Sequence, residues 1–336
     1  MADARSASEP ATTTASGPGS VPPGARPETR RQPEAPPQAA PRPRYPAQAL
    51  TGAQALWRHT QGDPGITIGV VDGPPQLSHP SLTGADLQSL QPWRFPPAVT
   101  MSPHMAEHGT WTASVLFGQP GSNLPGLVPR CRGLVVCPPI DDTITPDPLF
   151  GARAVDELLQ AGADVIQFTP AFYTASGDAD DLFKRAIARA VEQGVLVTAP
   201  AGNDYGRNSA APAILPGVLA VGAHRTDGTM FSFSNHGPHY AGHGLTALGE
   251  AVLGAHPSGG VKAQKGTCVA VALATGAAAL LLSLQRHLGH RPDPLAVRDA
   301  LLSTARPCTP AQTDGQPERC LNGHLDLPAA AAHLIG

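Results

Sequence analysis

The sequence predicts one α/β domain with a mostly parallel sheet flanked by helices. Short apolar segments alternate along the chain with longer segments whose apolar residues recur at helical spacing. Neighbouring parallel strands must be joined by a long crossover, and such helical segments provide it. The chain has 336 residues, of which 41% are hydrophobic and 15% charged, so it is also long enough to enclose a sizeable core.

Five strands and six helices are expected from these patterns. The strands are residues 66–71, 133–136, 163–168, 195–199 and 218–222. The helices are residues 53–60, 108–116, 148–159, 182–192, 269–284 and 295–304. Gly194 marks the end of one helix. Asp293 followed by Pro294 marks the start of the last, because Asp caps a helix and Pro fits its first turn.

Residues 1–48 are expected to form a disordered segment ahead of a domain that spans residues 49–336. Pro, Ala, Ser and Arg dominate this segment, and large apolar side chains are nearly absent. Such a segment cannot bury enough surface to offset chain entropy. An inert tail is the simplest interpretation, and a tether or partner-recognition arm is the alternative.

Composition argues against several kinds of partner. The net charge is −3 and no basic block occurs, so nucleic-acid binding is not expected. The N-terminus lacks the apolar segment of a secretory signal, and the apolar run at 269–284 is shorter than a bilayer span. We therefore expect a cytoplasmic protein with no membrane partner.

No glycine-rich phosphate loop occurs, so no organic cofactor is expected. The acidic cluster Asp178, Asp180 and Asp181 is interpreted as a helix cap rather than a metal site.

The five cysteines do not suggest a disulfide framework in a chain of this size. Cys131 and Cys137 lie on one predicted strand, about 20 Å apart if it is extended, so they cannot pair there. Cys308 and Cys320 flank a polar, turn-rich segment, where they either close a short loop or remain free thiols. None of the spacings matches a zinc site.

Four chemically capable side chains are predicted at one edge of the sheet. Asp72 and Asn203 follow predicted strands, while His108 and Cys268 begin predicted helices. The carboxyl ends of parallel strands and the N-termini of the following helices meet at the same edge. In an acyl-transfer site, Asp72 would orient His108, which would take the proton of Cys268. Asn203 and the backbone N–H of Cys268 would receive the oxyanion.

Each of these residues also has a simpler structural explanation. Asp72 and Asn203 are of the types that form turns, and His108 could serve only as a helix cap. Cys268 before an apolar helix could be a small buried side chain. It is their order along the chain and their shared edge that favour a functional interpretation.

These motifs resemble those of the subtilisin-like proteases (subtilases) from about residue 50 to 332. The matching segments are Val70-Val71-Asp72-Gly73 with His79-Pro80, His108-Gly109-Thr110, Ala201-Gly202-Asn203, Phe233-Ser234-Asn235-His236-Gly237, and Gly266-Thr267-Cys268 with Gly276. The resemblance implies a subtilisin-like fold, catalytic roles for Asp72, His108 and residue 268, and an oxyanion role for Asn203.

Within this family, the chain is most similar to the cyanobactin maturation proteases, which trim leader or follower sequences from ribosomally made peptides. The stretches that carry this second resemblance are Leu56-Trp57, Gly62-Asp63-Pro64, Asp72-Gly73-Pro74, Leu77-Ser78-His79-Pro80, Cys131-Arg132-Gly133-Leu134, residues 281–285 and the Cys308/Cys320 pair. The resemblance implies a precursor peptide as substrate, with other biosynthetic enzymes as further candidate partners.

The sequence also departs from the subtilase pattern at its centre. Cys268 stands where the family has Ser, and Ala272 stands where it usually has Pro. Residues 167–171 replace an Asn-x-Ser-x-Gly-like edge that binds substrate. Two hypotheses follow. The chain is either a thiol-dependent peptidase acting on a precursor peptide, or a catalytically impaired pseudoprotease that binds such a peptide or a partner enzyme.

Overall fold

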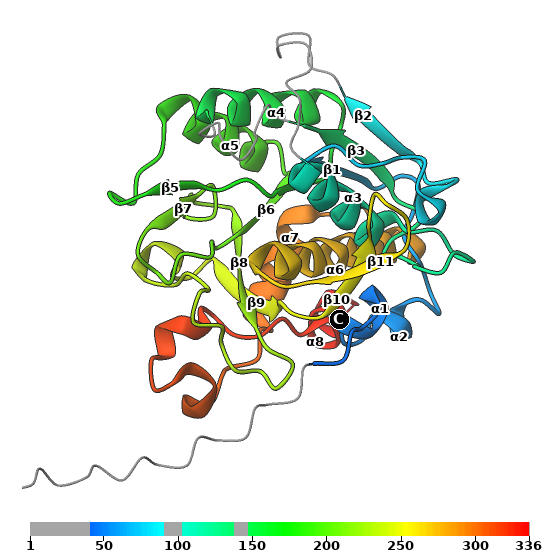
Figure 1. Ribbon diagram of the computed structural model, residues 1–336. Coiled ribbons are helices and arrows are strands. Elements are labelled where there is room, and N and C mark those ends of the chain that lie inside the picture. Colours follow the sequence, from blue (N-terminus) through cyan, green and yellow to red (C-terminus); the bar gives the residue numbers. More distant parts are fainter. Residues whose placement is uncertain (1–40, 91–102, 138–146, 336) are drawn as a thin grey trace, which may run out of the picture. The chain divides into compact units, whose positions relative to one another are not determined.

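A seven-stranded parallel sheet forms the centre of the domain (Figure 1). The computed structural model describes residues 41–90, 103–137 and 147–335. In spatial order the strands are β2 (Leu87–Leu90), β3 (Arg132–Val136), β1 (Thr67–Val71), β4 (Val165–Phe168), β6 (Leu196–Pro200), β8 (Leu219–His224) and β9 (Gly244–Leu248). The expected parallel α/β sheet is confirmed, and its carboxyl edge is where the site residues of β1 and β6 emerge.

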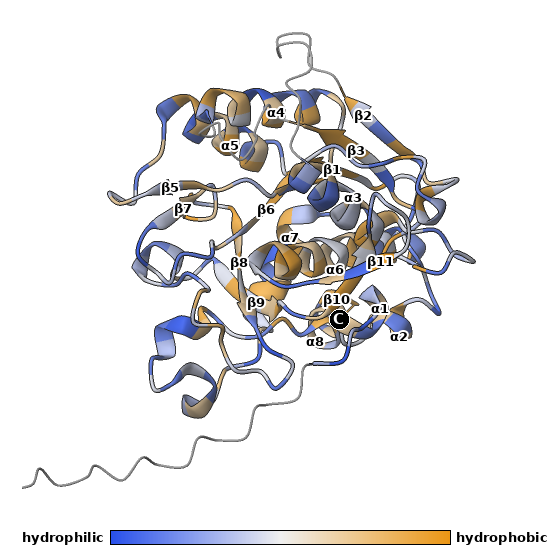
Figure 2. Ribbon diagram, viewed as in Figure 1, coloured by the Kyte–Doolittle hydropathy of each residue, from blue (hydrophilic) through white to orange (hydrophobic). Residues whose placement is uncertain are grey.

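Helices cover both faces of this sheet and enclose two apolar cores. One face carries α4 (Pro148–Gln160) and α5 (Asp181–Glu192). The other carries α1 (Pro46–Ala49), α2 (Ala53–Leu56), α3 (Pro103–Phe117), α6 (Thr267–His287), α7 (Pro294–Ser303) and α8 (Leu327–Ile335). Figure 2 shows central strands such as β3, β6 and β8, together with α6, among the most hydrophobic parts of the chain. Because both faces of the sheet are covered, the inner strands β1, β4 and β6 are buried along their whole length and show no alternation.

Helix α6 lies in the middle of the larger core. Its residues are buried almost without interruption from Thr267 to Leu284, because it packs on β4, β6, β8 and β9 as well as on α2, α3, α7 and α8. At Gly276 a Cβ would come within 2.3 Å of Leu127 Cδ1, so only glycine lets that side chain pack on the helix. Within the described ranges, α6 is the one helix long and apolar enough to cross a bilayer. Since 94% of its apolar window is buried, it is a core helix, as expected.

The five predicted strands and six predicted helices all occur, with shifted ends. Asp293 caps α7 by accepting hydrogen bonds from the N–H groups of Leu295 and Ala296, as its sequence position predicted. Several short strands were not predicted. They are β2, β9, the antiparallel pair β5 (Phe172–Thr174) and β7 (Ser209–Ala211), and the hairpin β10 (Val252–Ala255) and β11 (Val261–Gln264).

The ordered domain starts earlier than the boundary expected at residue 49. Arg44 forms a bridge with Val252, and the first helix buries Ala47 and Ala49. These contacts are long-range, so the composition of the segment did not reveal them. The rest of the segment expected to be disordered, residues 1–40, lies outside the described residues.

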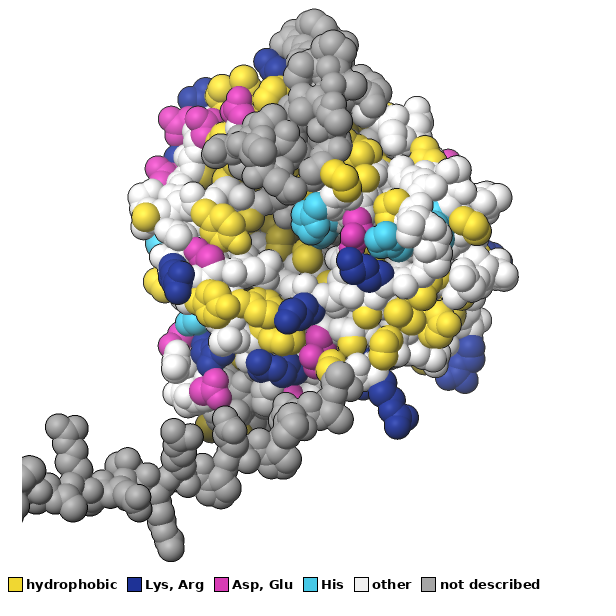
Figure 3. All heavy atoms as spheres, viewed as in Figure 1, with side chains coloured by type: hydrophobic (Ala, Val, Ile, Leu, Met, Phe, Trp, Pro, Cys, Tyr) yellow, Lys and Arg dark blue, Asp and Glu magenta, His cyan; other side chains and the backbone are white. Residues whose placement is uncertain are grey.

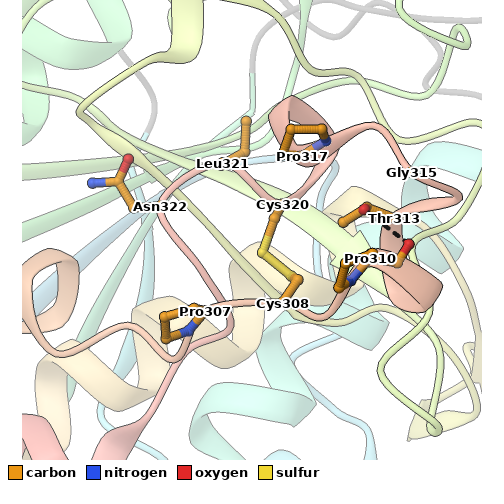
Figure 4. Close-up of a pocket in the computed structure, with 9 residues that line it drawn as sticks. All are labelled: Pro307, Cys308, Pro310, Thr313, Gly315, Pro317, Cys320, Leu321 and Asn322. Carbon is orange, nitrogen blue, oxygen red and sulfur yellow. Dashed lines mark hydrogen bonds between the residues drawn. A yellow bond between two sulfur atoms is a disulfide. The ribbon is translucent and has the colours of Figure 1, made fainter.

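Cys308 and Cys320 form a disulfide, which settles the question that their spacing left open. The bond closes a loop with two short 3₁₀ helices, Pro310–Thr313 and Pro317–Cys320, and lines a small surface pocket with them (Figure 4). Closing a loop of this length is worth about 3 kcal/mol of stability through chain entropy. Cys131 and Cys137 are free, as predicted.

Candidate active site

Asp72 lies at the carboxyl end of β1 and is buried. Its Oδ1 accepts a hydrogen bond from the N–H of Gly73 at 2.7 Å, and its Oδ2 accepts one from the Thr112 hydroxyl at 2.8 Å. A buried carboxylate is costly unless it is hydrogen-bonded or paired with a cation. Asp72 is therefore held in one orientation, with both oxygens still directed toward a further donor.

That donor is His108 on α3. Its Nδ1 lies 2.7 Å from Asp72 Oδ1 and 3.0 Å from Oδ2. The expectation that His108 opens a helix was wrong, since α3 already begins at Pro103. His108 therefore lies within the helix, and Thr112, four residues later, shares its face. Both side chains reach the same carboxylate for that reason.

Two glycines bring α3 against the end of β1. A Cβ on Gly73 would lie 1.9 Å from the carbonyl oxygen of Met105, and a Cβ on Gly109 would lie 1.9 Å from the carbonyl oxygen of Gly73. Real Cβ atoms essentially never approach other atoms so closely. The Asp-Gly and His-Gly pairs in the sequence thus have a common explanation, because the two backbones touch where Asp72 meets His108.

The charges of Asp72 and His108 stabilise each other. Burial works against ionisation of His108, but the charge and hydrogen bond of Asp72, together with the Cys268 side chain, raise the pKa of His108 well above its usual value. Burial likewise opposes ionisation of Asp72, but the charge and hydrogen bond of His108, with smaller help from Gly73 and Thr112, lower the pKa of Asp72. The pair is therefore suited to hold a positive charge on the imidazole.

Cys268 lies in the first turn of α6 and is partly buried. Its side chain lies close enough to His108 to help raise the pKa of the imidazole. Gly266, the N-cap of α6, has φ +143°, which favours glycine. A Cβ at Gly266 would lie 3.1 Å from Cys268 Sγ and within 4 Å of the Asn203 side-chain amide. The thiol and the amide therefore face the same small space, at the N-terminal turn of α6.

Asn203 follows β6 and is fixed by Thr267. Its Oδ1 accepts hydrogen bonds from the Thr267 N–H at 2.9 Å and from the Thr267 hydroxyl at 3.0 Å. Because both partners donate to Oδ1, the amide nitrogen is the end that remains for a ligand. The loop behind it is held by Asn235, whose Oδ1 accepts from the N–H groups of Asp204 and Gly206.

The structure thus brings together the four residues predicted from the sequence, and it adds others that the prediction missed. Thr112 and Thr267 orient Asp72 and Asn203. The position of Thr112 four residues after His108 was a usable signal. The hydrogen-bond partner of Asn203 could not be predicted, because Thr267 is 64 residues away in the sequence.

No group of three or more His, Cys, Asp or Glu side chains suited to a metal ion occurs within residues 41–90, 103–137 and 147–335. The acidic cluster before α5 has a structural role instead. Asp180 caps the helix by accepting from the N–H groups of Leu182 and Phe183, and Lys184 pairs with both Asp178 and Asp181.

Charged and histidine side chains also gather beside the site, over α3 and β11 (Figure 3). Glu107, the neighbour of His108, contacts Lys262 Nζ at 2.5 Å and His256 Nε2 at 3.3 Å. These contacts join the β10–β11 hairpin to the helix that carries His108. All three side chains are partly exposed to solvent, so each pair contributes little to stability.

Solved structures of other proteins share this fold. The prenylagaramide maturation protease PagA matches with a TM-score of 0.78 and 40% identity, over 85% of this chain and 99% of that chain. The PatG macrocyclase in complex with peptide matches with a TM-score of 0.81 and 32% identity, over 89% of this chain and 100% of that chain.

Sequence comparison gives the same family. Subtilisin-like protease 1 of Arthroderma gypseum is 39% identical over 110 residues, which make up 32% of this chain and 22% of that protein. The match thus spans less than a quarter of that relative's length. Residues 63–323 match the model of the Subtilase family. Since this match covers most of the chain, including all four site residues, the protein belongs to the subtilase family.

Proposed function

We propose that this protein is a thiol-dependent peptidase that cleaves a ribosomally made precursor peptide by acyl transfer to Cys268. The observation that carries this proposal is the hydrogen-bonded series Thr112, Asp72 and His108, with the Cys268 side chain close enough to raise the pKa of the imidazole. An inert fold has no need for a buried, oriented carboxylate behind a histidine that contacts a thiol. Asn203 faces the same space as the thiol.

The geometry supports one role for each residue in this proposal. Cys268 Sγ attacks the carbonyl carbon of the scissile amide, and its proton passes to His108 Nε2, since Nδ1 is already bonded to Asp72. The carbonyl oxygen becomes an oxyanion, which accepts hydrogen bonds from the Asn203 amide nitrogen and from the backbone N–H of Cys268. The carbon–nitrogen bond then breaks as His108 returns the proton to the leaving amine.

A thioester remains on Cys268 after this step. Water or a peptide amine attacks its carbonyl carbon, His108 removes the proton from the attacking group, and the carbon–sulfur bond breaks. Attack by water completes hydrolysis, whereas attack by an amine transfers the acyl group to a new peptide. The names of the related structures fit either outcome, because PagA is a maturation protease and PatG a macrocyclase.

The direct test is a peptide-based trap that reacts only with an activated thiol. We expect it to label Cys268 in the wild-type protein and to label the His108→Ala variant at least a hundredfold more slowly, in line with the usual contribution of a general base. Equal labelling of both proteins would contradict the proposal. Labelling by iodoacetamide serves as the control for exposure of the thiol.

A second candidate function is that of a pseudoprotease, which binds a precursor peptide or a partner enzyme without cutting it. Three departures from the subtilase pattern favour this alternative. They are Cys268 itself, Ala272 and the segment 167–171. The Cys268→Ser variant separates the two. A gain of peptidase activity indicates an otherwise complete site. No gain, combined with tight peptide binding by Cys268→Ala, favours the binding protein.

A further inference from the structure

Tyr173 contacts the candidate oxyanion residue Asn203 at its backbone, whereas Thr267 contacts its side chain. It lies in β5, which pairs with β7 in register Tyr173 with Ala210. Its hydroxyl oxygen accepts a hydrogen bond from the backbone N–H of Asn203 at 3.0 Å. Its ring rests on Gly202, where a Cβ would lie 3.1 Å from the ring atom Cε1. The side chain is 49% exposed, so this contact lies at the surface of the site.

Asn203 is therefore anchored at two points. Thr267 holds its side-chain oxygen and Tyr173 holds its backbone nitrogen. The residue before it, Gly202, has φ +104° and no side chain of its own to fix the turn. A hydrogen bond to the Asn203 backbone helps to fix its Cα, and the position of the side-chain amide depends on that Cα.

The tyrosine also lies within electrostatic reach of the nucleophile. Burial is the main cause that raises the pKa of Tyr173, and negative charge on Asp204 and on Cys268 raises it further. A hydroxyl that is influenced by Cys268 and bonded to Asn203 lies beside the space where the carbonyl oxygen of a substrate would be held.

We propose that Tyr173 is a positioning residue that fixes Asn203 for stabilisation of the oxyanion. The inference rests on the proposed acyl transfer to Cys268. The Tyr173 hydroxyl acts through Asn203 and does not touch the reacting atoms. Its removal should therefore weaken binding of a tetrahedral adduct and leave binding of an unreacted peptide unchanged.

The test compares a peptide aldehyde with the amide of the same sequence. The aldehyde forms a hemithioacetal, in which the Cys268 sulfur bonds to the carbonyl carbon and the oxygen occupies the oxyanion position. The ratio of the two affinities therefore reports oxyanion binding without turnover. We expect Tyr173→Phe to lower this ratio about tenfold, as for the loss of one hydrogen bond, with unchanged amide affinity and unchanged alkylation of Cys268 by iodoacetamide.

A double-mutant cycle of Tyr173→Phe and Asn203→Ala shows whether Tyr173 affects the affinity ratio by positioning Asn203. We expect Asn203→Ala alone to lower the ratio by about a hundredfold, and the double variant to equal it, because no amide is left to position. Additive losses would overturn the inference, and so would a Tyr173→Phe protein with the wild-type ratio. The matched control is Tyr205→Phe, which removes a hydroxyl from a tyrosine two residues after Asn203 and should change nothing.

The same experiment separates this inference from the proposed function. A wild-type protein that binds aldehyde and amide equally would overturn both, because it would have no reactive thiol. A wild-type protein that prefers the aldehyde, together with an unaffected Tyr173→Phe variant, would overturn the role of Tyr173 alone.

Discussion

The contact between Gly73 and Gly109 gives a sharp prediction about the catalytic geometry. In a Gly109→Ala variant, the new Cβ would lie 1.9 Å from the Gly73 carbonyl oxygen and 2.4 Å from its carbonyl carbon. Both atoms belong to the backbone, so a side-chain rotation cannot relieve the clash. Helix α3 must move away from the end of β1 by roughly 1 Å, and a misplacement of that size can cost about a hundredfold in rate.

The effect on stability should be smaller than the effect on rate. Alanine is favoured over glycine inside a helix by about 1 kcal/mol, and overpacking of a tight contact costs typically 1–3 kcal/mol. These contributions partly cancel. We therefore expect a modest loss in the free energy of unfolding, while labelling of Cys268 by the peptide trap slows about a hundredfold.

The matched control for this variant is Gly151→Ala. Gly151 also lies in a helix, but a Cβ there would meet aromatic side-chain carbons at 3.0–3.1 Å, which can shift by a few tenths of an ångström. It should label at the wild-type rate. If Gly109→Ala labels as fast as Gly151→Ala, the close backbone contact does not position His108 and the reasoning is refuted.

Three further predictions concern charge and cross-linking. Asp72→Asn should lower the pKa of His108, because burial then acts without its counter-charge; an NMR titration of the imidazole measures this, and an unchanged value would contradict it. In the wild-type protein, the low pKa of Asp72 contributes stability that is lost as pH falls through that pKa. The high pKa of His108 contributes stability that is lost as pH rises through that second pKa. The denaturant midpoints of the wild-type protein and of Asp72→Asn should therefore converge at low pH and at high pH. Replacing the Cys308–Cys320 disulfide by two serines should cost about 3 kcal/mol and lower Tm by roughly 5 °C, with trap labelling unchanged. Burial lowers the pKa of His324 from 6.5 to about 4, so His324 should make the fold progressively less stable as pH falls across that interval; a stability profile that is flat there would refute this.

The parts of the site that could be predicted from the sequence are those fixed by local pattern. Asp72 follows an apolar strand, and Cys268 stands two residues after Gly266 in the first turn of an apolar helix, so both could be placed at the sheet edge. His108 was placed at the right edge but in the wrong part of its helix. The run of small and apolar residues after it outweighed Pro103, which is a valid start signal at the first helical position.

Contacts between distant segments account for what the sequence could not show. Tyr173 reaches Asn203 only because β5 pairs with β7, a three-residue pairing with no alternating pattern strong enough to reveal it. Gly73 and Gly109 read as ordinary turn and helix residues until their backbones are seen to touch. The same holds for Arg44, whose bridge to Val252 extends the domain beyond its compositional boundary.

The anchoring of Asn203 bears directly on what a thiol can do in this site. Thr267 and Tyr173 fix both ends of the residue, so its amide cannot follow a carbonyl oxygen displaced by the larger sulfur atom. In the proposed reaction, an oxyanion formed on Cys268 would then be held less well than one formed on a serine, and attack on an unactivated amide would be slower. Attack on a thioester depends less on oxyanion stabilisation than attack on an amide does, because the thioester is the more reactive acyl donor. We therefore expect Cys268→Ser to speed amide cleavage but to lower the share of acyl groups passed to an added peptide amine rather than to water. Product ratios from one activated peptide ester, measured with both proteins, decide this, and equal ratios would show that the sulfur does not direct the outcome.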